Sequence, residues 1–186
     1  MLPATRPGLI RFSIAMLLLA FVAACATATL PLFQAAEKGD TRAMKSLLDS
    51  GTNVNTRNQK GETALMVVAR NNNEPAALLL LNKGVDVNAK DNSGYSSLMA
   101  ASSGGNINIV NGLLVRGVNV NDVASDGTTA LLAAARKGRM SVVDILLAKG
   151  ADLNARDNEG MTALGYAKKN KFAKLTKYLE DAGAKE

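Results

Sequence analysis

Apolar and small residues recur along this chain at a fixed interval of 33 residues. Leucines follow the interval as pairs and as single residues: Leu47-Leu48, Leu80-Leu81, Leu113-Leu114 and Leu146-Leu147, and Leu65, Leu98, Leu131 and Leu164. Two glycine series keep the same register: Gly61, Gly94, Gly127 and Gly160, and Gly51, Gly84, Gly117, Gly150 and Gly183. A regular period of this size predicts small units that cannot bury their apolar sides alone and therefore stack on one another.

Polar residues and glycines mark the ends of two short helices in each unit. A hydroxyl residue precedes each first helix, where its side chain can accept a hydrogen bond from a free backbone N–H group. These residues are Thr63, Ser96, Thr129 and Thr162. Gly39, Gly105 and Gly138 fall between the two helices, where a positive φ is easiest for glycine. The pattern therefore predicts helix-turn-helix units.

The unit from Asp126 to Ala155 matches a known repeat pattern better than the other units do. It runs Asp126-Gly127-Thr128-Thr129-Ala130-Leu131, then Val142-Val143-Asp144-Ile145-Leu146-Leu147, then Gly150-Ala151-Asp152-Leu153-Asn154-Ala155. The segment from about Leu30 to Ala184 resembles ankyrin repeats. The resemblance implies an all-α solenoid of helix-turn-helix units joined by short β-hairpin-like turns. About five repeats are expected, at residues 32–57, 58–90, 91–123, 124–156 and 157–186.

The last repeat differs from the others in a way that predicts a polar cap. Thr176 and Glu180 stand where the preceding unit has the apolar Val143 and Leu147. Polar groups are expected where no further repeat covers the stack. The histidine that ankyrin repeats commonly carry near the start of the first helix is absent, so the hydrogen bonds that it makes between repeats are expected to be missing.

The first 24 residues are expected to be a signal peptide and not part of the fold. Arg6 and Arg11 form a positive start, and residues 12–24 form an uncharged, mostly apolar run of 13 residues. That length suits a signal sequence and is short for a membrane span, which needs ~20 residues. The alternatives are a cut after Ala26 or Ala28, which would release a secreted protein, and an uncleaved anchor.

The end of this apolar run resembles the lipobox of bacterial lipoproteins. It reads Val22-Ala23-Ala24-Cys25, and Cys25 is the only cysteine of the chain. The resemblance implies cleavage before Cys25, a lipid on Cys25 and a short tether over residues 25–31. Ala26 is not Asp, which by the same resemblance favours sorting to the outer membrane, with the repeats facing the periplasm.

Composition argues against an enzyme and against a metal or cofactor site. The chain has no histidine, which is the commonest general base and metal ligand. It has no glycine-rich phosphate loop and no nucleophile motif, so neither catalysis nor a cofactor is expected. Met66 and Met99 recur at one helix position and are expected in the core.

Nucleic acid is not expected as a partner, although the net charge is +6 and the pI is near 9.6. The protein is predicted to be exported, and its basic residues are not interleaved with aromatic side chains on which bases could stack. We expect a monomer.

The resemblance to ankyrin repeats implies that a partner binds a concave surface made by the turn tips and the exposed side of each first helix. Carried over to this chain, the binding positions are Arg57, Lys60, Glu62, Arg70, Asn71, Lys90, Tyr95, Arg136, Lys137, Arg156 and Lys169. Turn and helix-end positions together hold nine basic and four acidic residues, which favours a protein partner with an acidic surface. Tyr95 is expected to be exposed and to anchor the partner.

Three binding functions stay open from the sequence, with an enzyme as the fourth and weakest alternative. The first is a lipid-anchored protein that holds another protein on its concave surface. The second is an envelope scaffold that binds peptidoglycan or anionic lipid, and the third is a secreted effector that binds a host protein. For any single charged residue, an ordinary solvated surface position is an equal alternative.

Overall fold

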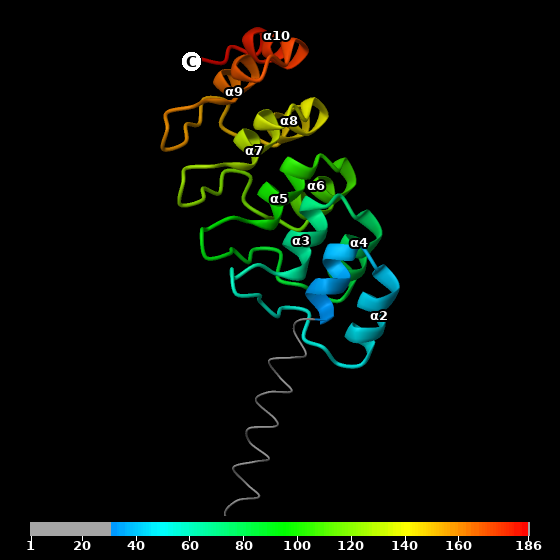
Figure 1. Ribbon diagram of the computed structural model, residues 1–186. Helices are drawn as coiled ribbons and strands as arrows, with labels where there is room; N and C mark the ends of the chain where they lie inside the picture. Colours follow the sequence, from blue (N-terminus) through cyan, green and yellow to red (C-terminus); the bar gives the residue numbers. More distant parts are fainter. Residues whose placement is uncertain (1–30, 186) are drawn as a thin grey trace, which may run out of the picture.

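The computed structural model describes residues 31–185, which form a stack of paired helices (Figure 1). Residues 31–38 are helical and are followed by α2 (Thr41–Asp49). The next pairs are α3 (Ala64–Arg70) with α4 (Glu74–Asn82), α5 (Ser97–Gly104) with α6 (Ile107–Leu114), α7 (Ala130–Arg136) with α8 (Met140–Ala148), and α9 (Ala163–Lys169) with α10 (Ala173–Asp181). Over this range the structure contains two isolated β-bridges, Arg57 with Thr63 and Lys90 with Ser96, and no strand. The all-α solenoid is confirmed.

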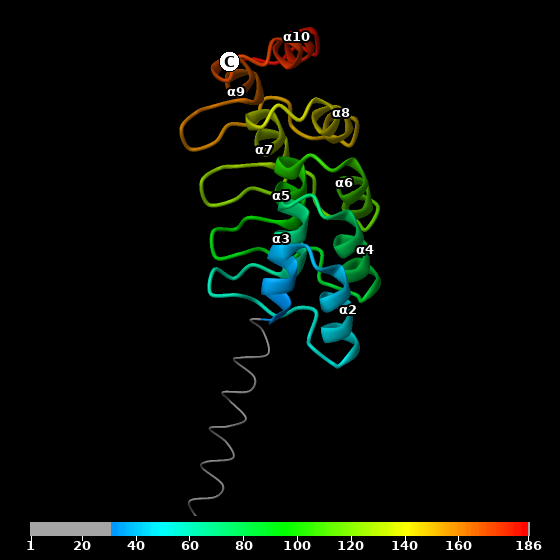
Figure 2. The same cartoon turned by 45° about the vertical axis from the view of Figure 1, so that its right-hand side comes forward.

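The helices form two layers with the loops on one side (Figure 2). The first helices of successive repeats, α3, α5, α7 and α9, stack in one column, and the second helices stack in another beside it. The long connecting loops project from the side of the first column that faces away from the second helices. We call α3, α5, α7 and α9 the inner helices and the loops before them the hairpins.

The core lies between the inner helices and the second helices. Every residue of α3 from Ala64 to Ala69 is buried, and so is every residue of α7 from Ala130 to Ala135. The small side chains let neighbouring inner helices pack closely. Met66 and Met99 are 2% and 0% exposed, which confirms their expected place in the core. Each fully buried side chain of leucine or methionine size contributes about 1.5–3 kcal/mol to folding.

The hydroxyl residues cap the inner helices as predicted. The side chains of Thr63, Ser96, Thr129 and Thr162 accept hydrogen bonds from the N–H groups of Met66, Met99, Leu132 and Gly165, at 3.1–3.5 Å. Each bond satisfies one N–H group that the first turn of a helix leaves free. The caps therefore fix where each inner helix begins and where its hairpin ends.

The turn between the two helices of a repeat has a positive φ in each repeat. Gly39, Gly105 and Gly138 adopt φ values of 72°, 92° and 65°, as predicted. The equivalent positions in the second and fifth repeats hold Asn72 and Lys171, both with φ of 60°. The sequence did not predict these two, because lysine does not mark such a turn and asparagine marks it less strongly than glycine does.

Backbone hydrogen bonds join the hairpins of successive repeats. The N–H groups of Asn92, Ser125 and Asn158 donate to the carbonyl oxygens of Lys60, Ser93 and Asp126, at 3.0, 2.8 and 2.9 Å. A side-chain series does the same at the foot of the hairpins, where Asn55, Asn121 and Asn154 accept from the N–H groups of Asp86, Asp152 and Lys185. These bonds connect repeats that lack the family's histidine.

The two ends of the described chain differ in character. Glu180 is exposed and pairs with Lys168 at 3.1 Å, and Thr176 is half-buried, as expected of a polar cap. At the other end the chain is already helical at residue 31, one residue before the predicted start of the first repeat. The predicted signal peptide (1–24), Cys25 and the rest of the tether lie outside the described residues. Between residues 31 and 185, no helix combines the length and the apolar character needed to cross a bilayer.

Candidate functional site

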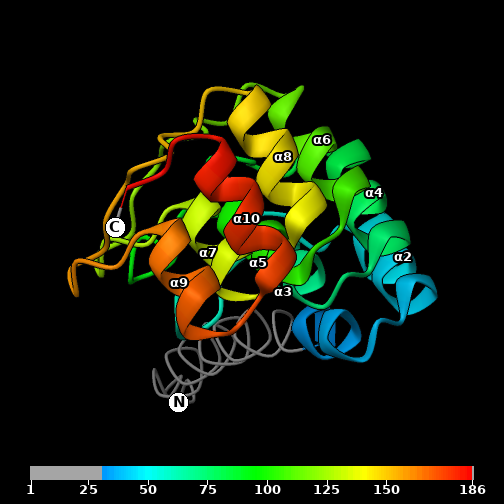
Figure 3. The ribbon, with the colours of Figure 1, turned by 90° about the horizontal axis from the view of Figure 1, so that it is seen from above.

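The hairpins and the C-terminal ends of the inner helices together make up the candidate binding surface, and Figure 3 shows these elements from above. We call it the inner surface. It comprises hairpin residues 57–62, 90–95, 123–128 and 156–161, and residues 70–71, 103–104, 136–137 and 169–170 at the helix ends. All eleven predicted binding residues belong to it. Their contacts divide them into residues that support the fold and residues that face outward.

Glu62 and Arg70 form an internal ion pair in the second repeat. The Nη1 atom of Arg70 lies 2.5 Å from Oε1 of Glu62, and Asn58 donates to Oε2 at 2.7 Å. Burial alone would raise the pKa of Glu62, but the hydrogen bonds from Arg70 and Asn58 outweigh it, and the pKa lies below its usual value. Glu62 is only 7% exposed and its carboxylate is held within the chain, so its role in binding a partner stays a prediction.

Three of the predicted basic residues hold the hairpins in shape. Arg57 donates from Nη1 to the carbonyl oxygens of Gly61 (3.1 Å) and Lys90 (2.5 Å). The Lys90 ammonium pairs with Asp122 at 3.0 Å. Arg156 donates to the carbonyl of Gly160 at 2.7 Å. Their donors are engaged with the chain itself, which a sequence pattern does not reveal.

Tyr95 is half-buried, and the prediction of an exposed anchor was wrong. Its ring packs against the core, and its hydroxyl donates to the carbonyl of Met99 at 3.4 Å. Burial raises the pKa of Tyr95 above its usual value. Tyr95 occupies the position equivalent to Glu62, and in both repeats this position turns its side chain inward.

The fourth and fifth repeats are joined by a contact that the sequence did not predict. The guanidinium of Arg136 lies over the ring of Tyr166, 5.9 Å from its centroid. The Tyr166 hydroxyl donates to a carboxylate oxygen of Asp157. Burial, together with the hydrogen bond to Asp157, raises the pKa of Tyr166 to about 12. Tyr166 stands where earlier repeats have Ala133 and Ala100, so no repeat pattern marked it.

The remaining predicted residues face outward. Lys60, Asn71, Lys137 and Lys169 are exposed, and Arg136 is half-exposed. None of the four cations among them, Lys60, Arg136, Lys137 and Lys169, has an acidic side chain within ion-pair distance in residues 31–185. Three of these cations gather on the ends of α7 and α9.

Comparison of the sequence with models of protein families identifies the family of these repeats. A model of three ankyrin repeats matches residues 32–124 and again residues 104–185. The chain belongs to the ankyrin-repeat family. Ankyrin repeats are generally protein–protein interaction modules and are typically non-enzymatic. A search of curated proteins found no match to this chain.

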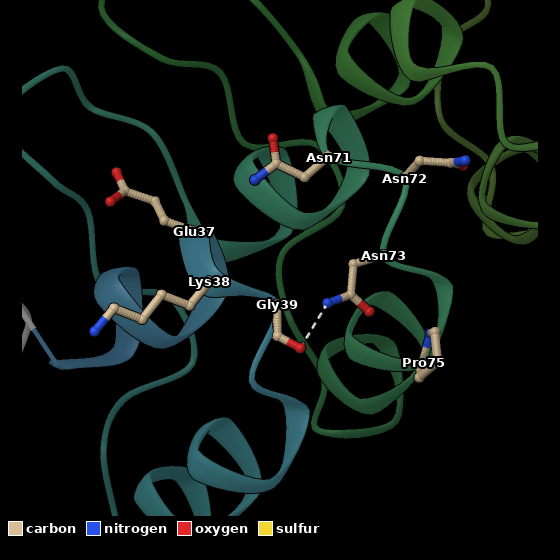
Figure 4. A pocket seen from close by; sticks show the side chains of 7 residues that line it. All are labelled: Glu37, Lys38, Gly39, Asn71, Asn72, Asn73 and Pro75. Carbon is tan, nitrogen blue, oxygen red and sulfur yellow. Dashed lines mark hydrogen bonds between the residues drawn. The ribbon is translucent and has the colours of Figure 1, made fainter.

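An open hollow of about 680 Å³ lies between the first and second ankyrin repeats (Figure 4). It is lined by Glu37, Lys38, Gly39, Asn71, Asn72, Asn73 and Pro75. The Asn73 side chain spans the two repeats and donates to the Gly39 carbonyl at 3.1 Å. Within residues 31–185, no three acidic, cysteine or histidine side chains converge to hold a metal ion. The hollow is a polar extension of the inner surface.

Proposed function

We propose that this ankyrin-repeat protein is exported, is anchored to a bacterial envelope membrane through a lipid on Cys25, and holds a partner protein with an acidic surface on its inner surface. One observation carries the second half of the proposal. Arg136, Lys137 and Lys169 reach outward without an acidic partner in the described chain, on a surface of the kind that ankyrin repeats offer to other proteins.

The location rests on the sequence. Cys25 follows the apolar run of residues 12–24 directly, and the first repeat is helical from residue 31. A tether of this length reaches ~20 Å when extended, which keeps the stack close to the bilayer. Each buried CH₂ of an acyl chain contributes about 0.8 kcal/mol to membrane binding, so two or three chains on Cys25 would hold it firmly.

The anchor is tested by mass spectrometry of the mature N-terminus. The expected result is a chain that begins at Cys25 and carries acyl groups there. The variant Cys25→Ser should leave the precursor uncleaved. A mature chain that begins after Ala26 or Ala28 without lipid would replace the anchored protein by a secreted one, which could bind a host protein.

The partner is tested by capture with the full-length protein from solubilised membranes. Asn71→Trp with Lys137→Trp places bulk on the inner surface, and Asn111→Trp with Lys177→Trp makes matched changes on the second helices. All four positions are exposed. We expect one dominant protein to be captured by the wild type and by the second pair, and lost with the first. Equal capture by both pairs would remove the inner surface from the proposal. Recovery of cell-wall fragments or lipid alone would favour an envelope scaffold.

A further inference from the structure

The basic residues of the inner surface are used differently in the two halves of the stack. In the second repeat, the guanidinium of Arg70 is held by Glu62 at 2.5 Å. In the fourth and fifth repeats, Arg136, Lys137 and Lys169 make no ion pair with residues 31–185. The uncompensated positive charge is therefore concentrated at the ends of α7 and α9.

Arg136 is held in place by neutral contacts that leave its hydrogen-bond donors available. The Arg136 guanidinium lies over the Tyr166 ring, and Asp157 accepts a hydrogen bond from the Tyr166 hydroxyl. Asp157 is itself fixed, because Oδ1 accepts from the N–H groups of Glu159 (3.0 Å) and Met161 (2.9 Å). This contact leaves the N–H donors of the Arg136 guanidinium without an ion-pair partner in residues 31–185.

Asp157 and Asp126 do not form ion pairs with this cluster. Asp157 is engaged by Tyr166. Burial alone would raise the pKa of Asp126. The hydrogen bonds from Thr128 and the positive charge of Arg136 outweigh burial, and the pKa of Asp126 lies below its usual value. No carboxylate of the described chain lies within ion-pair distance of Arg136. An in-plane fork of N–H donors without a partner fits a carboxylate, which accepts two parallel hydrogen bonds from arginine.

A second cation follows one repeat after Arg136. Lys169 occupies the position of Arg136 one repeat later, and α7 and α9 pack side by side. Packed helices have axes about 8–10 Å apart, a separation that one extended acidic segment can span. Lys137 adds a third charge next to Arg136.

We infer that the inner surface receives an extended acidic segment of the partner protein at the ends of α7 and α9, with one carboxylate bound by Arg136 and others by Lys137 and Lys169. This inference rests on the proposed function and narrows it to the fourth and fifth repeats. In the second repeat Glu62 already neutralises Arg70 and Lys90 pairs with Asp122, so Lys60 is the one inner-surface cation of that repeat without an ion pair in residues 31–185.

The test uses the full-length chain in detergent and a fluorescent peptide of alternating glutamate and serine, with a glutamine–serine peptide as the neutral control. Fluorescence anisotropy gives the affinity of each. We expect the triple variant R136Q/K137Q/K169Q to bind the glutamate peptide at least tenfold more weakly than the wild type. The matched triple variant K149Q/K174Q/K177Q removes the same charge from exposed positions outside the inner surface and should change affinity less than twofold. R136K keeps the charge, loses the fork and should weaken binding severalfold.

Other outcomes overturn the inference in distinguishable ways. Equal loss in both triple variants would mean that net charge, not this cluster, attracts the peptide. Binding of a phosphoserine peptide or of phosphatidylglycerol vesicles, without binding of the glutamate peptide, would assign the cluster to phosphate. If the partner protein is still captured in full by R136Q/K137Q/K169Q, the inference and the acidic-surface argument fail, while capture on the inner surface stands or falls separately with the Asn71→Trp/Lys137→Trp pair. Circular dichroism on each variant checks that the helices are retained.

Discussion

Lys171 adopts the same left-handed turn conformation as Gly138 one repeat earlier, with φ of 60° against 65°. An L-residue in this region pays a steric penalty of roughly 1–2 kcal/mol between Cβ and the backbone, which glycine avoids. We therefore expect Lys171→Gly to raise the free energy of unfolding by about 0.5–1 kcal/mol, part of the gain being offset by the greater freedom of glycine in the unfolded chain.

Asn72 is the matched control for this substitution, because it has the same φ of 60° but belongs to a residue type that tolerates the left-handed region. Asn72→Gly should change stability less than Lys171→Gly does. Urea unfolding followed by circular dichroism measures both. A larger gain at Asn72, or a loss at Lys171, would contradict the assignment of strain to this turn.

Ser97 and Ser102 carry buried hydroxyls in α5 that find no hydrogen-bond partner among residues 31–185. Equivalent positions hold alanine in neighbouring repeats, such as Ala64 for Ser97 and Ala135 for Ser102. Removing an unsatisfied buried polar group avoids its desolvation penalty, so each change to alanine should stabilise the protein by about 1 kcal/mol.

Substitution of the adjacent residue Ser96 by alanine is expected to lower stability, the opposite of the effect at Ser97. The Ser96 hydroxyl caps α5 by accepting from the N–H of Met99 at 3.3 Å. Ser96→Ala should therefore destabilise the protein by about 1 kcal/mol. Thermal unfolding of the single variants compares the signs, and a loss of stability in Ser97→Ala and Ser102→Ala would mean that those hydroxyls are satisfied.

Much of the fold could be predicted from the 33-residue repeat, because the repeat shows which positions are equivalent. Equivalent positions share the same structural requirement, such as a helix cap, a turn or burial. Hydroxyl caps, turn glycines and buried leucines all stand where the repeat places them. The repeat does not show which residue types other than glycine will adopt a positive φ at a turn position. For this reason Lys171 was not expected in a left-handed turn.

The site was harder to predict than the fold. Glu62 and Tyr95 share one position on hairpins that were expected to be exposed, yet both turn inward. Whether a hairpin side chain faces a partner or the next element depends on contacts between repeats, which the pattern of one repeat does not contain. Tyr166 illustrates the same limit: its support of Arg136 joins two repeats and has no equivalent elsewhere in the register.

The ion pair between Glu62 and Arg70 predicts a pH dependence of stability. The pKa of Glu62 is lowered in the folded chain, so its contribution is present above the pKa of the unfolded chain and is lost as the pH falls through the folded pKa. Glu62→Gln should lower the free energy of unfolding by about 1 kcal/mol near neutral pH, a modest value because the Arg70 side chain is half-exposed.

The measurement is the difference in unfolding free energy between wild type and Glu62→Gln as a function of pH. The difference should be constant near neutral pH and shrink on acidification. Glu159→Gln alters an exposed hairpin carboxylate and should change stability by less than about 0.5 kcal/mol. A difference that grows as the pH falls would contradict the lowered pKa of Glu62.

The hydrogen bonds of Asn121 join the third repeat to the fourth, and removing them tests how much this interface contributes to stability. Its Oδ1 accepts from the N–H of Asp152 at 2.9 Å, and its Nδ2 donates to the carbonyl of Gly150 at 3.0 Å. Stability in a repeat protein resides largely in such interfaces between neighbours. Asn121→Ala should therefore destabilise the chain by about 1 kcal/mol and expose the amide of Asp152 to faster hydrogen exchange.

Asn154 supplies the comparison at the end of the stack. Its Oδ1 accepts from the N–H of Lys185 at 2.8 Å, in the segment that follows α10, the last described helix. Because this segment can open without separating two complete repeats, Asn154→Ala should accelerate exchange at Lys185 with a smaller effect on global unfolding. If both variants lowered the free energy of unfolding equally, or if the Asp152 amide kept its protection in Asn121→Ala, the coupling would have to come from the hairpin backbone bonds alone.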